Sequence, residues 1–161
     1  MIDNETLDTM LWKKVSRIKQ ELNVTQIKAI ADLFAHIVDY KSPFTSNHSI
    51  GVAEGAEKIS RFMGFDEDIC QKMYLAGALH DIGKVAIGNE ILEKPEKLTD
   101  EEFKTMKHHA VYTYYILSGI DDFEEIRDWA ALHHEKLNGK GYPFGKTADE
   151  LNEQERIMAC I

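Results

Sequence analysis

The sequence predicts an all-α protein, a bundle of about six to seven helices. Apolar residues recur at intervals of three and four through most of the chain, the spacing of a helix with one buried face. No segment alternates apolar and polar residues over the length of a β-strand. Helix-starting signals such as the capping box Thr99-Asp100-Glu101-Glu102 precede several of the apolar stretches. Periodicity and end signals therefore agree on the fold class.

The N-terminal half of the chain is expected to contain four helices. Each combines a stripe of apolar residues with a residue that suits one of its ends. Asn23 is an acceptable cap, the Ser42-Pro43 pair breaks a helix, and Gly64 suits the position just after a helix end. The expected helices cover residues 7–21, Asn23 to Ser42, about 46–63 and about 66–79.

The C-terminal half is expected to alternate helices with irregular segments. Glycines and a proline interrupt residues 83–98 and leave room for a short helical turn at most. The same residue types exclude a helix from residues 138–147, whereas the paired His133-His134 are expected to end one. The expected helices cover residues 99–119, about 122–134, and a stretch that opens at Asn152.

Length and composition indicate one soluble domain. A chain of 161 residues is long enough to bury a sizeable core. Its formal charge of −9 argues against binding to double-stranded nucleic acid, because phosphate backbones select basic surfaces. No apolar run approaches the ~20 residues that cross a bilayer, so no membrane is expected. The dispersed cysteines Cys70 and Cys160 predict a reducing, cytoplasmic location.

The domain organisation separates two parts of the chain. Residues 1–41 are interpreted as N-terminal helices, which either connect to an upstream module or belong to the core; core packing is favoured. Residues 42–161 are interpreted as the main domain. It contains the residue pairs that are most suited to chemistry, His80-Asp81 and His133-His134.

These two pairs suggest a metal site. His80-Asp81 ends an apolar helix, so both side chains can reach a site beside the helix end, and the two oxygens of Asp81 could bridge two ions. His133-His134 could give one imidazole to each ion. Carboxylate plus several imidazoles suits Fe, Mn or Zn better than Ca or Mg. Taken alone, His80-Asp81 could equally be a polar pair at a helix end.

Other histidines need separate interpretations. His36 lies among apolar residues and is interpreted as a core histidine. His108 and His109 are adjacent on one helix and diverge by about a hundred degrees, so one of them is expected on the surface. His48 stands alone in the sequence.

The glycine-rich run after His133-His134 has two interpretations. Gly139-Lys140-Gly141-Tyr142-Pro143 could be a simple turn-rich connection, as loops of this composition usually are. Beside two histidines of metal-ligand type, the rim of a site is favoured. Tyr142 could stack on a guanine base or pack the loop down, and the sequence leaves both open.

Together these motifs resemble the HD superfamily of metal-dependent phosphohydrolases and, within it, the HD-GYP family. The resemblance covers about residues 42–161. It depends on the ordered set of segments rather than on the His-Asp pair alone. These segments are Phe44 to Ser49, His80-Asp81-Ile82-Gly83-Lys84, Ile91 to Pro95, Leu98 to Phe103, Met106 to His109, and His133 to Pro143.

The resemblance implies a function and a ligand set. Family members open cyclic di-GMP to the linear dinucleotide, and some continue to GMP. The positions that match metal ligands are His48, His80, Asp81, His109, His133 and His134, with Asp81 between two divalent ions, Fe or Mn most readily. Phe44 stands where relatives with three metals have a glutamate, so the match is to the two-metal type.

The resemblance also implies a mechanism and partners. A hydroxide bridging the two metals would attack phosphorus, with Asp81 and Lys84 as the catalytic residues. Lys84 and the segment Gly141, Tyr142 and Pro143 would bind substrate; a solvated helix-end cation is the plain alternative for Lys84. The same segment would dock a cyclase-type (GGDEF) partner domain. Apart from the resemblance, homo-oligomers are a further partner prediction, because a second copy could cover the apolar last helix. The alternative functions are hydrolysis of a different cyclic dinucleotide or nucleotide, and a non-catalytic scaffold that docks a partner through the same segment.

The chain departs from the family pattern in two places. Asn138 replaces a common aspartate, a change that conserves size. Arg156-Ile157 leads toward the family's remaining aspartate ligand, which by this alignment would follow Ile161. The chain is therefore interpreted as a C-terminally truncated member, in which one ion has a carboxylate fewer.

Overall fold

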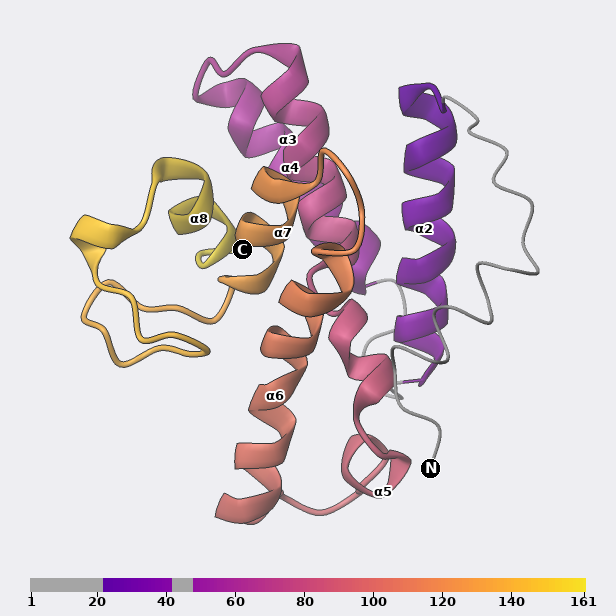
Figure 1. The fold of residues 1–161 in the computed structure, drawn as a ribbon, viewed down its shortest axis with the longest axis vertical. Helices are drawn as coiled ribbons and strands as arrows, with labels where there is room; N and C mark the ends of the chain where they lie inside the picture. Colours follow the sequence, from indigo (N-terminus) through magenta and orange to yellow (C-terminus); the bar gives the residue numbers. More distant parts are fainter. Residues whose placement is uncertain (1–21, 42–47) are drawn as a thin grey trace.

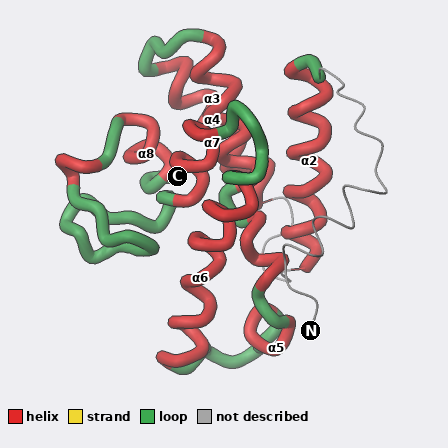
Figure 2. Tube along the Cα trace, viewed as in Figure 1, coloured by secondary structure: helices red, strands yellow, loops and turns green. Residues whose placement is uncertain are grey.

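The computed structural model describes residues 22–41 and 48–161, and within these ranges it is all-α, as predicted (Figures 1 and 2). The expected helix over residues 7–21 lies outside the described residues. An isolated bridge between Asn138 and Thr147 is the only β-type pairing in the described ranges. The helices are α2 (Val24–Lys41), α3 (His48–Phe62), α4 (Glu67–Leu79), α5 (Asn89–Leu92), α6 (Asp100–Leu117), α7 (Glu124–Ala131) and α8 (Glu153–Met158), with 3-10 turns η1 (Ile82–Ala86) and η2 (Ala148–Glu150).

Side chains at the helix starts account for the agreement in the N-terminal half. The Asn23 carboxamide accepts a hydrogen bond from the Gln26 amide at 3.0 Å, and α2 begins after it. Asp66 accepts one from the Ile69 amide at 2.9 Å and caps α4. Gly64 follows α3 with φ +83°, the left-handed conformation expected after a helix end. These caps provide partners for amides and carbonyls that a helix leaves free.

The core is built on α4, which packs against α2, α3 and α7. A Cβ placed on Gly77 of α4 would lie 2.6 Å from the Ala53 Cα of α3, so only glycine permits this close crossing. Ala31 and Ala35 bring α2 into the same core. In Figure 1, α2 flanks one side of the bundle, and the loop that leads to α8 lies on the other. His36 is exposed on α2, so its interpretation as a core histidine was wrong; its neighbour Ala35 faces inward.

The C-terminal half contains two differences from the prediction. Residues 83–98 were expected to contain one short helical turn at most, but both η1 and the four-residue α5 lie there; α6 and α8 begin where their caps predict. Helix α7, however, ends at Ala131 instead of at the paired histidines. Leu132 leaves helical geometry with φ −95° and ψ 8°, and the Glu135 amide then donates to the Leu132 carbonyl at 2.9 Å. His133 and His134 therefore lie in a turn.

Replacing Thr99 with alanine should destabilise the protein by about 1 kcal/mol, because the N-terminal cap of α6 is lost. The Thr99 hydroxyl accepts from the Glu102 amide at 3.3 Å, and the Glu102 carboxylate accepts from the Thr99 amide at 2.7 Å. Urea unfolding measures the change. Thr105→Ala removes the same atoms from an exposed site within α6 and should change stability by less than about 0.5 kcal/mol. Equal effects of the two variants would contradict the cap's contribution.

Candidate metal centre

A cavity of about 310 Å³ opens where the ends of α3, α4 and α7 meet. It contains most of the residues that the sequence singled out. Its polar lining consists of His48, His80, Asp81, Lys84, His133 and His134, and its apolar lining includes Val52, Met158 and Ile161. Residues separated by 86 positions in the chain, from His48 to His134, therefore share one hollow.

The six residues that match metal ligands form two groups of three. His48, His80 and Asp81 make one group, and the ligand atoms within it lie within 4.8 Å of one another. His109, His133 and His134 make the other, with the same spacing. The sequence suggested one ion for each of His133 and His134, whereas the structure places both beside His109. The His133 ring also lies 4.8 Å from the His80 ring, between centroids, so the groups adjoin.

Asp81 connects the two groups. Its Oδ2 lies 3.1 Å from His80 Nε2 and 2.6 Å from Lys84 Nζ. Its Oδ1 points to the other group, 3.4 Å from His109 Nε2 and 3.9 Å from His133 Nε2. This Oδ1 is buried and, among the described residues, accepts no hydrogen bond. A buried carboxylate oxygen without a donor is costly, and a bound cation would satisfy it. The residues present therefore fit a divalent metal centre.

Three of the histidines are oriented by the same contact. Each imidazole Nδ1 lies 2.7 Å from the backbone carbonyl three residues earlier: Gly77 for His80, Met106 for His109 and Ala130 for His133. A carbonyl can only accept, so Nδ1 must carry the proton. The remaining Nε2 of each ring faces the Asp81 carboxylate, at 3.1 Å for His80, 3.4 Å for His109 and 3.9 Å for His133. Proteins commonly orient metal-binding histidines in this way.

Burial keeps four of the imidazoles in the neutral form that binds metals. It lowers the pKa of His48 and His109 below the ordinary value and lowers that of His133 well below it. Burial and the nearby His109 lower the pKa of His134 to about 4. Each of these rings is therefore uncharged near pH 7 and keeps a lone pair available.

His80 and Asp81 titrate as a coupled pair. Burial alone would lower the pKa of His80 and raise that of Asp81. Their mutual attraction outweighs burial, so the pKa of His80 is raised and that of Asp81 is lowered well below its ordinary value, with Lys84 contributing to the second shift. The Asp81 carboxylate is thus ionised at neutral pH.

Comparison with known proteins decides the family. A family model described as an HD domain matches residues 32–161. This chain belongs to the HD-domain family. The HD domain is 38% identical over 141 residues to a 3'3'-cGAMP-specific phosphodiesterase 1 of Vibrio cholerae, covering 88% of this chain and 33% of the relative. It is 34% identical over 127 residues to the cyclic di-GMP phosphodiesterase response regulator RpfG of Xanthomonas campestris, covering 78% of this chain and 34% of the relative.

A third relative comes from another organism. A cyclic di-GMP phosphodiesterase of Thermotoga maritima is 33% identical to this HD domain over 132 residues, which are 81% of this chain and 36% of the relative. The chain thus spans about a third of the length of each of these curated relatives. None of the helices in residues 22–41 and 48–161 is long and apolar enough to cross a membrane.

Two polar residues make supporting contacts in this HD domain that the sequence prediction did not include. Asp39 of α2 is buried and accepts from the Ser49 hydroxyl at 2.7 Å and the Ser49 amide at 3.1 Å, which caps α3 next to His48. The Thr113 hydroxyl of α6 donates to the His80 carbonyl and accepts from the Gly83 amide, each at 3.0 Å. Asp39 is polar within an apolar stretch, a signal that could have indicated it.

The Gly-Tyr-Pro segment of the HD domain touches the second histidine group. The Tyr142 ring lies 4.5 Å from the His134 ring, between centroids, at 34°. Gly141 packs its backbone against Glu135, and the Tyr142–Pro143 peptide bond is cis. His108 is exposed and lies outside both groups, whereas His109 is buried, in line with the preference for His109.

A second hollow adjoins the first. A cleft of about 540 Å³ lies along residues 91–98 and shares Lys84 and His134 with the cavity, and Tyr142 forms part of its wall. Lys94, which also lines the cleft, is paired with Glu102 at 2.6 Å. The histidine groups therefore lie at the junction of two hollows with room for a ligand larger than a metal ion.

Proposed function

We propose that this HD domain is a metal-dependent phosphodiesterase that hydrolyses a 3'-5' phosphodiester of cyclic di-GMP. The observation that carries the proposal is the buried, unpartnered Asp81 Oδ1 between two groups of histidines. The HD-domain match and the names of the relatives support the reaction class. The donor set of imidazoles and one carboxylate suits Fe, Mn or Zn better than Ca or Mg, and the family resemblance favours Fe or Mn among these.

The protein's own residues have distinct tasks in this proposal. His48, His80 and Asp81 would hold one ion, and His109, His133 and His134 the other, with Asp81 between them. Two bound ions would supply Lewis acidity and lower the pKa of water. Lys84 Nζ, which is 2.6 Å from Asp81, would offset charge on the phosphoryl oxygens. The adjoining cleft offers space for the rest of the dinucleotide.

A second substrate has specific support. Relatives with names that specify 3'3'-cGAMP are 38% and 39% identical to this chain. We therefore propose 3'3'-cGAMP as the alternative substrate at the same site, because both molecules present the same phosphodiester to the metals. Binding to a cyclase-type domain, homo-oligomers and a cytoplasmic location stay predictions from the sequence.

The two neighbouring histidines of α6 provide a matched test. His109→Ala should lower hydrolysis by more than about 100-fold and metal content from two ions per chain toward one, since it removes a ligand of one ion and not only a supporting contact. His108→Ala removes an exposed ring one residue away and should leave both unchanged. Metal is measured by elemental analysis after loading with Fe(II) or Mn(II), and hydrolysis by chromatography of cyclic di-GMP and 3'3'-cGAMP.

The outcomes separate the alternatives. Faster turnover of one dinucleotide in direct competition identifies the substrate. A metal-loaded protein that leaves both intact would be a binding or scaffold module instead. A His108→Ala variant as impaired as His109→Ala would show that the proposed ligand assignment is wrong.

A further inference from the structure

His134 differs from the other histidines of its group in how it is held. His109 and His133 are oriented by backbone carbonyls through Nδ1. Within the described ranges the His134 imidazole makes no hydrogen bond, although its ring is only partly exposed. It is held by ring contacts alone, with centroid distances of 4.0 Å to His133, 4.5 Å to Tyr142 and 5.2 Å to His109. Of these three, His109 belongs to α6 and His133 to the same turn as His134, whereas Tyr142 comes from the glycine-rich loop that follows.

The loop that carries Tyr142 is fastened to the backbone around His134. The Tyr142 amide donates to the His134 carbonyl at 3.2 Å. A Cβ on Gly141 would lie 2.4 Å from both the Glu135 Cα and the Lys136 amide nitrogen, so the two chain segments are in direct contact. The Tyr142 ring is thereby placed over the ring of His134, the residue to which the Tyr142 backbone is hydrogen-bonded.

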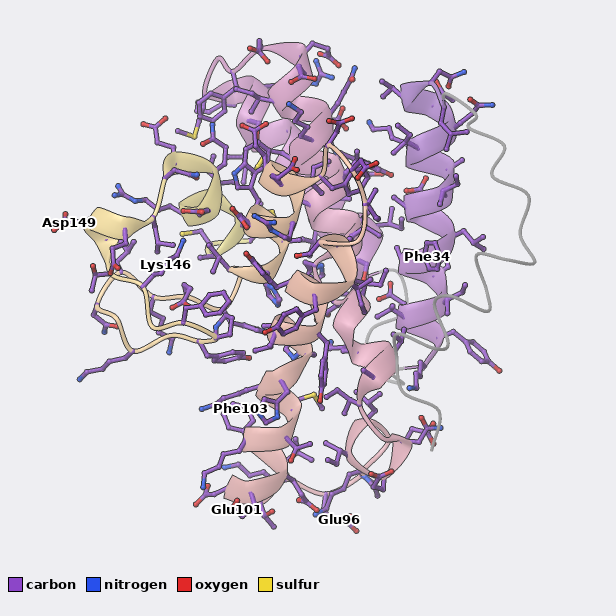
Figure 3. The ribbon with its side chains drawn as sticks, in the orientation of Figure 1. Phe34, Glu96, Glu101, Phe103, Lys146 and Asp149 are labelled. Carbon is purple, nitrogen blue, oxygen red and sulfur yellow. The ribbon has the colours of Figure 1, made fainter. Side chains whose placement is uncertain are left out.

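The far side of the loop is fastened by Glu135. Its carboxylate is 3% exposed and lies among backbone amides instead of cations. Oε1 accepts from Phe144 at 2.7 Å and from Gly145 at 3.0 Å, and Oε2 accepts from Lys146 at 3.0 Å. Figure 3 labels Lys146 in this loop, close to the end that leads toward Asp149. Hydrogen bonds to an ionised acceptor are about twice as strong as neutral ones, so Glu135 closes the loop firmly.

We propose that Glu135 and Tyr142 are positioning residues for His134. Glu135 closes the Gly-Tyr-Pro loop, the closed loop places the Tyr142 ring, and the ring fixes the His134 imidazole in the way that carbonyls fix its neighbours. This inference rests on the proposed metal centre, in which His134 is a ligand. It also favours the packing interpretation of Tyr142, because the ring face that meets His134 is not free to stack on a guanine base.

Three substitutions test separately the contributions of the Tyr142 hydroxyl, the Tyr142 ring and the Glu135 carboxylate. Tyr142→Phe keeps the ring and removes a hydroxyl that has no hydrogen bond among the described residues, so it is the matched control. Tyr142→Leu removes the ring but keeps apolar bulk. Glu135→Gln keeps the shape, but an amide nitrogen cannot accept a hydrogen bond, so at least one of the three amides loses its partner.

The first readout needs no metal. A ring at 4.5 Å shifts the NMR resonance of the His134 Cε1 proton, which can be assigned by its loss in His134→Ala. We expect this resonance to move in Tyr142→Leu and Glu135→Gln and to stay in Tyr142→Phe. Loss of the ring current alone moves the resonance in Tyr142→Leu, so Glu135→Gln, which keeps the ring, is the deciding variant. A resonance that is unmoved in Glu135→Gln would overturn the inference, whatever the metal does. If Glu135→Gln fails to fold, the metal affinity of Tyr142→Leu decides the result.

The second readout is metal affinity, measured by competition with a chelator for Mn(II). Tyr142→Leu and Glu135→Gln should each weaken binding by roughly 10–100-fold, the usual effect of losing a residue that orients a ligand. In a His134→Ala background neither should weaken it further. Turnover number should fall with KM for the dinucleotide unchanged, whereas a base-stacking Tyr142 would raise KM.

The two proposals fail in different ways. Wild-type protein that binds no Mn(II) would overturn the metal centre, and with it the positioning role. If the wild type binds Mn(II) and every variant binds it equally tightly, the positioning role alone is overturned. An equal loss with and without His134 would assign Glu135 and Tyr142 a general structural role and so contradict the inference.

Discussion

An Asp81→Asn variant should lose metal binding and hydrolysis almost completely. The substitution keeps the shape of the side chain and removes the charge between the two histidine groups. Asp81 Oδ1 lies 3.4 Å from His109 Nε2, and Oδ2 lies 3.1 Å from His80 Nε2, so one change affects both groups. Because a supporting residue alone is worth 10–100-fold, loss of the connecting carboxylate should exceed about 100-fold in metal affinity.

The measurement is Mn(II) affinity together with turnover of cyclic di-GMP. Asp68→Asn is the control, because this carboxylate lies at the other end of α4 and pairs with Lys72 at the surface. The control should match the wild type in both assays. Two metals per chain in Asp81→Asn would contradict the connecting role of Asp81.

The same variant should change how the metal-free protein responds to pH. The pKa of Asp81 is lowered below its ordinary 3.8, so its stabilisation is present above that pH and is lost as pH falls through the lowered value. The pKa of His80 is raised above 6.5, so its stabilisation is present below that pH and is lost as pH rises through the raised value. The stability difference between wild type and Asp81→Asn should therefore be largest between these limits, near pH 5 in urea unfolding with EDTA.

Much of the fold could be predicted from the sequence because its signals are local. The caps Asn23, Asp66, Thr99 and Asn152 each bond an amide three residues away, so their pattern is visible in the chain. The end of α7 was predicted three residues late. His133 and His134 are compatible with a helix. The turn that contains them is followed at once by Glu135, whose carboxylate accepts from amides 9 to 11 residues further on, and contacts at that separation are not visible in the local sequence pattern.

The sequence could indicate which residues form the candidate site, but not which residues hold them in place. Five of the six residues that match metal ligands lie at or just beyond a helix end, whereas His109 lies in the middle of α6, where that helix packs against η1. Asp39, Thr113 and Glu135 were not assigned roles. The Thr113 hydroxyl forms hydrogen bonds with Gly83 and His80, which lie 30 and 33 positions earlier in the chain. Both partners are backbone groups, which any residue type would provide. Only the packed structure shows which carbonyl or amide each of these side chains meets.

A Gly83→Ala variant should be destabilised by roughly 3 kcal/mol, at the upper end of the cost of overpacking. A Cβ on Gly83 would lie 1.9 Å from the His109 carbonyl oxygen and 2.6 Å from the Thr113 amide nitrogen. Both obstacles are backbone atoms of α6, so no side chain can move aside. The turn η1 would have to separate from α6, which would break the hydrogen bond from the Gly83 amide to Thr113.

This separation should also damage the metal centre, because η1 carries Lys84 and follows Asp81 while α6 carries His109. The free energy of unfolding, measured in urea, and the affinity for Mn(II) should both fall. Gly51→Ala is the matched control, since its new methyl on the exposed face of α3 meets no atom of the described residues within 4 Å. Alanine is the better helix former, so the control should gain about 0.5–1 kcal/mol. A Gly83→Ala protein with wild-type stability and metal affinity would mean that η1 and α6 are not in backbone contact. Other contacts would then have to hold Asp81 and His109 close together.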